Sequence, residues 1–94
     1  MRNLFMEQTK IYTIIKAEAR EGADAINILM TTADKEKAQR KFKREVSLDK
    51  KTNLYWQNGN RQLFEDTDGY YYVYDINDHM MNYTLIVLKE TILK

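Results

Sequence analysis

The beginning of the chain alternates in the manner of a β-strand. Residues 9–19 are rich in β-branched and aromatic side chains, with Ile11 and Ile15 on one side of an extended backbone and Tyr12 and Ile14 on the other. Such side chains fit the pleated surface of a sheet, and their period of two predicts a strand. We therefore expect the fold to begin with this strand.

A turn and a second extended segment follow. Gly22 can take a positive φ in a turn, and residues 25–31 then resume the alternation with Ile26 and Ile28 on one side. The two segments predict a hairpin. A helix over residues 23–30 is the alternative, because Ala, Leu and Met tolerate one.

The long segment 31–48 has the periodicity of a helix. Ala38, Phe42 and Val46 recur every fourth residue, so they share one stripe at about 100° per residue, and no Gly or Pro interrupts the segment. Thr32 or Asp34 is expected to cap the first turn. The narrow stripe predicts a helix that packs on one face of a sheet.

The dipeptide Asn58-Gly59 predicts a second hairpin, over residues 54–64. A two-residue type I′ turn needs positive φ at both central positions, which Asn-Gly tolerates. The resulting register would place Trp56 directly across from Arg61.

Two further strands are expected, at residues 70–76 and from about residue 82 to residue 93. The last strand is apolar on both sides. Because one helix covers one face of a sheet, the second face needs another cover. The 54–64 hairpin, the N-terminal residues 1–8, another chain and the loops of a twisted sheet are the alternatives.

These elements predict an α+β fold, with a small antiparallel β-sheet and one main helix packed on one face. The order is β-β-α-β-β, with an extra hairpin at 54–64. Ninety-four residues suit one domain, 1–94, in which residues 1–8 form a loose N-terminal arm.

Composition narrows the class of protein. Hydrophobic residues make up 44% of the chain and charged residues 31%, which favours a folded domain over a disordered one. The absence of cysteine excludes disulfides, thiolate zinc sites and cysteine nucleophiles, and it suits a reducing cytoplasm, where we expect the protein to lie. The longest strongly apolar run, residues 85–88, predicts neither a membrane span nor a signal peptide.

Charge is unevenly distributed although the net charge is only +1. Residues 34–51 hold eight Lys or Arg against four Asp or Glu, whereas residues 52–94 hold three against six.

The outer face of the expected helix is basic and could follow a phosphate backbone or dock on an acidic protein. A solvated face with a Glu36–Arg40 pair is the alternative. The near-neutral net charge favours a protein partner over nucleic acid. The residues predicted for this surface are Lys37, Arg40, Lys41 and Arg44.

Tyrosines alternate along the segment 70–74, so one set must enter the core and the other must face away from it. The second set could form an aromatic binding surface together with an arginine, the composition typical of interaction hot spots. An ordinary exposed sheet face is the alternative. The residues predicted for this partner-binding surface are Tyr55, Trp56, Arg61, Tyr70, Tyr72 and Tyr74.

Few residues of the sequence are candidates for metal binding or catalysis. His79 lies near two aspartates in a polar loop, and residues 66–69 are similar to the middle of a calcium-binding loop in which Phe64 takes the first ligand position. Loops of this composition are usually turns. The three glycines form no phosphate-binding loop. We therefore expect no enzymatic activity and no catalytic, cofactor or metal site.

The order of these elements, with the helix entrance at 31–38, the tyrosine-rich segment 71–75 and the last strand at 82–87, resembles the small single-helix β-β-α-β-β proteins of bacteriophages and conjugative elements. The resemblance covers most of the chain and carries over no functional residue. It implies a non-enzymatic interaction module, such as an inhibitor or adaptor that acts on a host protein. A homodimer is a further expectation, and nucleic-acid binding by the basic helix face is the alternative function.

Overall fold

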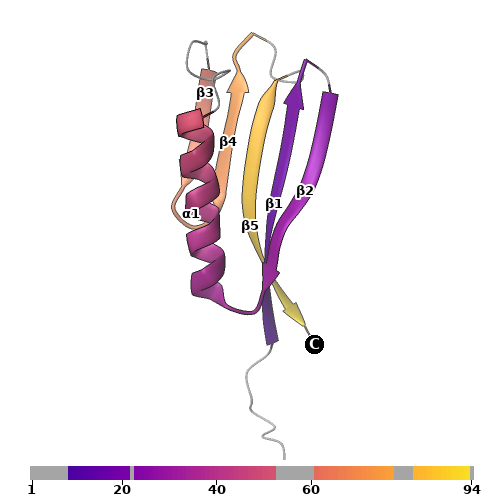
Figure 1. The fold of residues 1–94 in the computed structure, drawn as a ribbon, viewed down its shortest axis with the longest axis vertical. Helices are drawn as coiled ribbons and strands as arrows, with labels where there is room; N and C mark the ends of the chain where they lie inside the picture. Colours follow the sequence, from indigo (N-terminus) through magenta and orange to yellow (C-terminus); the bar gives the residue numbers. More distant parts are fainter. Residues whose placement is uncertain (1–8, 22, 53–60, 78–81, 94) are drawn as a thin grey trace, which may run out of the picture.

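The computed structural model describes residues 9–21, 23–52, 61–77 and 82–93, which form one helix and five strands. The helix packs on one face of a single sheet (Figure 1), so the predicted α+β class is confirmed. The elements are β1 (Thr9–Arg20), β2 (Ala23–Thr32), α1 (Lys35–Thr52), β3 (Arg61–Asp66), β4 (Tyr70–Asp75) and β5 (Tyr83–Leu93).

The sheet has the strand order β2-β1-β5-β4-β3, and every neighbouring pair is antiparallel. β1 and β5 form its centre, paired from Thr9 opposite Leu93 to Ala19 opposite Tyr83. The pairing of β1 with β2 shifts by one residue where Ile14 and Ile15 lie opposite Met30 and Ile28, so Leu29 forms a bulge. β2 and β3 are consequently the edge strands.

The helix begins later than its predicted start at Thr31, because Thr31 and Thr32 continue β2 and pair with β1. Asp34 is the N-cap: its Oδ1 accepts a hydrogen bond of 3.1 Å from the Lys37 amide, and its carbonyl accepts one from Ala38. The helix also runs past the predicted end at Leu48 to Thr52. The alternative of a helix over 23–30 was wrong, since this segment belongs to β2.

The core lies between α1 and one face of the sheet. Ala38 and Phe42 from the predicted stripe are buried there, and Val46 packs against them partly buried. Their partners come from the three central strands β1, β5 and β4. The buried strand residues of this cluster are Tyr12, Ile14, Tyr71, Val73 and Ile86.

The turn between β3 and β4 requires a glycine. Gly69 has a φ of 152°, and a Cβ built on it would lie 2.8 Å from the Cβ of Leu88. The carboxylate of Asp66 holds this turn, because its Oδ1 accepts hydrogen bonds from the backbone amides of residues 68–70. At the β1–β2 turn Glu21 takes a positive φ of 54°; the predicted turn residue Gly22 lies outside the described residues.

The predicted hairpin at 54–64 is described only from Arg61 onwards. That part belongs to β3, whose neighbour is β4. The first half of the hairpin, including the predicted Trp56–Arg61 pair, and the arm at residues 1–8 lie outside the described residues.

Candidate functional site

The sheet face that is turned away from α1, called the open face below, carries apolar side chains on all five strands. Strand alternation sets its membership, because the neighbours of the core residues point to the other side. One row of directly opposed residues crosses the whole sheet in the order Ile26, Ala17, Leu85, Tyr72 and Phe64. The row therefore brings apolar residues from the first and the second half of the sequence together on one surface.

A second row runs beside the first and is equally apolar over four strands. It consists of Ile28, Ile15, Val87 and Tyr70, in that order. Several of these side chains are well exposed: the exposed fraction is 73% for Ile26, 69% for Ile28, 49% for Phe64 and 40% for Tyr70. Large apolar side chains exposed side by side are typical of interaction surfaces.

Aromatic rings cluster on the β3–β4–β5 side of the open face. The ring centroid of Tyr72 lies 5.2 Å from that of Tyr74 and 6.2 Å from that of Tyr83, both in tilted arrangements. Phe64 stacks on Tyr74 with centroids 6.2 Å apart. Centroid separations of this size are favourable for aromatic pairs, so the rings support one another.

The environment of Tyr72 changes its acidity. Burial raises the pKa of its hydroxyl above the usual value, and the neighbouring tyrosines Tyr70, Tyr74 and Tyr83 raise it further. A tyrosine hydroxyl is protonated at neutral pH even at its ordinary pKa of 10.0, and the raised pKa of Tyr72 widens the pH range over which this hydroxyl can donate a hydrogen bond.

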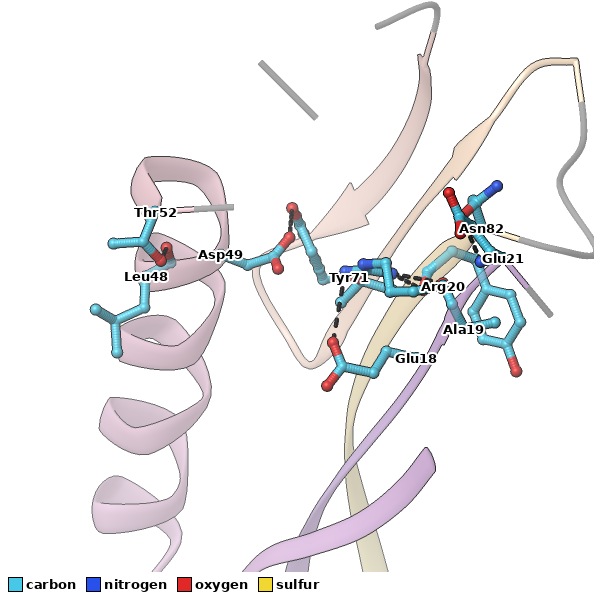
Figure 2. Close-up of polar contacts among 11 residues, drawn as sticks. Glu18, Ala19, Arg20, Glu21, Leu48, Asp49, Thr52, Tyr71 and Asn82 are labelled. Carbon is cyan, nitrogen blue, oxygen red and sulfur yellow. Dashed lines mark hydrogen bonds and ion pairs between the residues drawn. The ribbon is translucent and has the colours of Figure 1, made fainter. Parts of the chain in front are cut away.

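The end of the sheet beside this cluster is held by Arg20. Its guanidinium donates hydrogen bonds to the carbonyl of Tyr83 at 2.6 Å and to the hydroxyl of Thr84 at 2.7 Å (Figure 2). The backbone amide of Glu21 donates to the side chain of Asn82 at 2.9 Å. These contacts join the end of β1 to the start of β5 and so fix the backbone that carries Tyr83.

Only some of the residues predicted for the aromatic and arginine surface lie on the same face of the sheet. Tyr70, Tyr72 and Tyr74 share the open face, as their alternation predicted. Arg61 lies on the opposite side of the sheet, because its strand neighbour Leu63 pairs with the core residue Val73. The expectation that Arg61 joins the tyrosines was therefore wrong. Tyr55 and Trp56 lie outside the described residues.

The predicted basic surface lies on the outside of α1. Lys37, Arg40 and Arg44 are exposed, and Arg40 approaches Glu36 at 4.0 Å, which is the expected i,i+4 pair. Lys41 is less accessible, because it is partly buried and its Nζ lies 2.9 Å from a carboxylate oxygen of Glu45. Three of the four predicted cations are thus presented to solvent.

A buried polar pair connects the end of α1 to the sheet. The hydroxyl of Tyr71 donates a hydrogen bond of 2.7 Å to Oδ2 of Asp49 (Figure 2), and both side chains are buried. Burial, this hydrogen bond and the carboxylate charge together raise the pKa of Tyr71 far above its usual value. The pair holds the helix against β4 and faces the core, away from the open face.

The described residues contain no candidate metal site, but they do form an open groove. They contain no group of three His, Cys, Asp or Glu side chains placed to hold a metal ion. His79 lies outside them. An open groove of about 520 Å³ lies between α1 and the β3–β4 turn, with Phe42 and Val46 on its helix side and residues 65–67 on the other.

Comparison of the chain with protein-family models, with curated proteins and with solved structures found no match. Within the described residues no helix is both long enough and apolar enough to cross a membrane.

Proposed function

We propose that this protein is a non-enzymatic interaction module that binds another protein through its open face. The observation that carries the proposal is the apolar row from Ile26 to Phe64, which crosses every strand of the sheet and whose two end residues are well exposed. Burial of such a row against a partner would remove apolar surface from water, which is the main driving force of association.

The size of the open face fits a protein partner better than a small molecule. Five strands at a spacing of about 4.8 Å make the face roughly 20 Å wide, and the residues of the two apolar rows lie side by side along it. Contiguous apolar areas of a few hundred Å² are typical of protein interfaces, whereas small ligands prefer concave sites.

The side chains also indicate the chemistry of the partner. The aromatic cluster of Tyr72, Tyr74, Tyr83 and Phe64 offers large, fairly rigid apolar surfaces with hydroxyl groups among them. Tyrosine is among the residues that contribute most to binding energy. We expect a partner surface that is mainly apolar and supplies hydrogen-bond acceptors to the tyrosine hydroxyls.

Quantitative affinity capture from a lysate tests this function. Tyr70→Lys and Phe64→Lys place charges on the open face at exposed positions, and we expect them to reduce retention of a specific partner roughly tenfold or more. Arg40→Glu, on the outside of α1, is the control and should retain the partner. Retention that is unaffected by both open-face substitutions would refute the proposal.

Nucleic-acid binding by α1 is the second candidate, and it is supported by the exposure of Lys37, Arg40 and Arg44. Charge reversal at Arg40 and Arg44 should weaken binding and flatten its salt dependence, because fewer counterions are released. Mobility shifts at low and moderate salt measure both effects. The absence of any shift at low salt would end this candidate.

We include the type of partner and the location of the protein in the same proposal. A role as an inhibitor or adaptor that acts on a host protein, and a location in the cytoplasm, rest on the resemblance in element order and on the cysteine-free composition. Mass spectrometry of the partner captured through Tyr70 and Phe64 would identify the process in which the protein acts.

A further inference from the structure

Within the described residues, the edge formed by β2 has little protection against pairing with another strand. Among the described strands β2 pairs with β1 alone, so its other side presents unpaired backbone amides and carbonyls. Its sequence, ADAINILMTT, contains no Lys, Arg or Pro, and Asp24 is its only charged residue. The first six residues, 23–28, are all exposed.

The opposite edge, β3, is different. It is only six residues long and carries Arg61, Glu65 and Asp66. Lys50 from α1 lies 2.8 Å from a carboxylate oxygen of Glu65, and Asp66 is engaged in the turn to β4. Short length and charge are the usual means by which proteins block strand pairing at an edge. β3 has both of these, whereas β2 is ten residues long and carries a single charged residue, Asp24.

We propose that β2 pairs in antiparallel orientation with β2 of a second copy of this chain, centred on Ile26. The bulge at Leu29 limits the regular part of the edge to residues 23–28, because a bulge interrupts a ladder. A two-fold axis perpendicular to the sheet then places Ile26 opposite its own copy. The result is a continuous sheet of ten strands.

The register is chemically self-complementary. Directly opposed residues in an antiparallel pair lie on the same side of the sheet, and Asp24, Ile26 and Ile28 all share the open face. Centring on Ile26 places Asp24 opposite Ile28 of the other copy, so the only charge of the strand does not meet itself. Both open faces lie on the same side of the joined sheet and become one apolar surface.

A second copy fits this edge better than an unrelated strand because the two copies of Ile26 would lie opposite each other and cover each other. The regular segment of six residues is about 20 Å long, and an interface of this length is small compared with the roughly 800 Å² per partner of a stable complex. We therefore expect the dimer to be weak and reversible. It does not depend on the proposed partner of the open face.

Cross-linking through single cysteines tests the register. The chain contains no cysteine, so Ile26→Cys introduces its only thiol. In the proposed dimer the two Cβ atoms at position 26 lie about 5 Å apart, close to the separation in a disulfide. Ile28→Cys is the matched control, because Ile28 lies on the same strand and face with a similar exposure, but its two copies would lie about 14 Å apart.

We expect mild oxidation with diamide to cross-link the Ile26→Cys protein roughly tenfold faster than the Ile28→Cys protein, as a dimer on non-reducing gels. Equal rates would overturn the proposal, and so would faster cross-linking at position 28, which would show a different register.

Analytical ultracentrifugation tests the association itself. The wild-type mass should rise from 11.3 kDa towards twice that value with concentration. Ile26→Lys should raise the dissociation constant of the dimer roughly tenfold or more, and circular dichroism checks that it folds. Phe64→Lys alters the open face at the other edge and should leave the dimer unchanged. A wild-type protein that stays at 11.3 kDa up to submillimolar concentration would overturn the proposal.

Discussion

Tyr71→Phe removes a single hydroxyl from the interior, and its effect on stability should depend on pH. In the native protein this hydroxyl donates a 2.7 Å hydrogen bond to the carboxylate of Asp49, and the exposed fractions of the two residues are only 2% and 5%. The phenylalanine ring keeps the packing against the core. The substitution therefore isolates the hydrogen bond from the apolar contacts.

At neutral pH the hydrogen bond should contribute about 1.5–3 kcal/mol, the range typical of hydrogen bonds to charged groups. Asp49 also takes part in at least one other interaction. We expect the free energy of unfolding to fall by this amount in the Tyr71→Phe protein.

At alkaline pH the difference should shrink. Burial and the bond to Asp49 raise the pKa of Tyr71 above its ordinary value of 10.0, so the folded protein keeps the phenolic proton after the unfolded chain has lost it. The stabilisation is complete below pH 10 and is lost as the pH rises above it, at about 1.4 kcal/mol per pH unit. The phenylalanine variant lacks this loss.

Urea denaturation from about pH 8 to about pH 11 measures both effects. The gap between the wild type and Tyr71→Phe should narrow by about 1.4 kcal/mol across this range, with most of the change above pH 10. Tyr70→Phe is the control, because Tyr70 is exposed and immediately precedes Tyr71 in the sequence. This substitution should change the free energy of unfolding by less than about 0.5 kcal/mol. A gap that is absent at neutral pH, or constant across the range, would refute the reasoning.

Four further substitutions test the core, the helix cap and the β3–β4 turn by thermal or urea denaturation. Phe42→Ala should cost about 3–5 kcal/mol because this ring is buried, whereas Phe64→Ala at an exposed position should cost less than about 1 kcal/mol; similar losses would contradict the assigned faces. Asp34→Ala should cost about 1 kcal/mol by removing the helix cap, and an unchanged stability would mean that another group caps the helix. Gly69→Ala should lower the free energy of unfolding by about 1–3 kcal/mol, because the added methyl group clashes with Leu88. An unchanged stability would show that the turn shifts to make room for the methyl group.

Period-two alternation was sufficient to predict most of the sheet. It located β1, β4 and β5 to within a residue or two, and it separated Tyr71 and Val73 in the core from the tyrosines of the open face. The helical stripe of Ala38 and Phe42 was equally informative. These patterns are local, and burial on one face imposes them directly on the sequence.

The features that were missed depend on contacts between distant residues. The sequence predicts a helix from Thr31 with Thr32 or Asp34 as its cap; pairing with β1 extends the strand through Thr32, so of the two predicted caps Asp34 is the one that the helix uses. Arg61 was assigned to the wrong face because its position depends on the register of β3 against β4. No local pattern encodes that register.

The Asp49–Tyr71 pair had a signal that was available in the sequence. Asp49 follows Phe42 by seven residues, or about two helical turns, so it continues the apolar stripe of α1. A carboxylate on such a stripe indicates a buried polar partner. Which partner it binds could not be predicted, because Tyr71 is 22 residues away in the chain.

The position of α1 on one side of the sheet has a consequence for how many molecules the protein can hold at once. The exposed cations of the helix, Lys37, Arg40 and Arg44, and the rings of Phe64 and Tyr70 are presented in opposite directions, with the core between them. A ligand on either side leaves the other side accessible. The two proposed binding surfaces therefore would not compete for space.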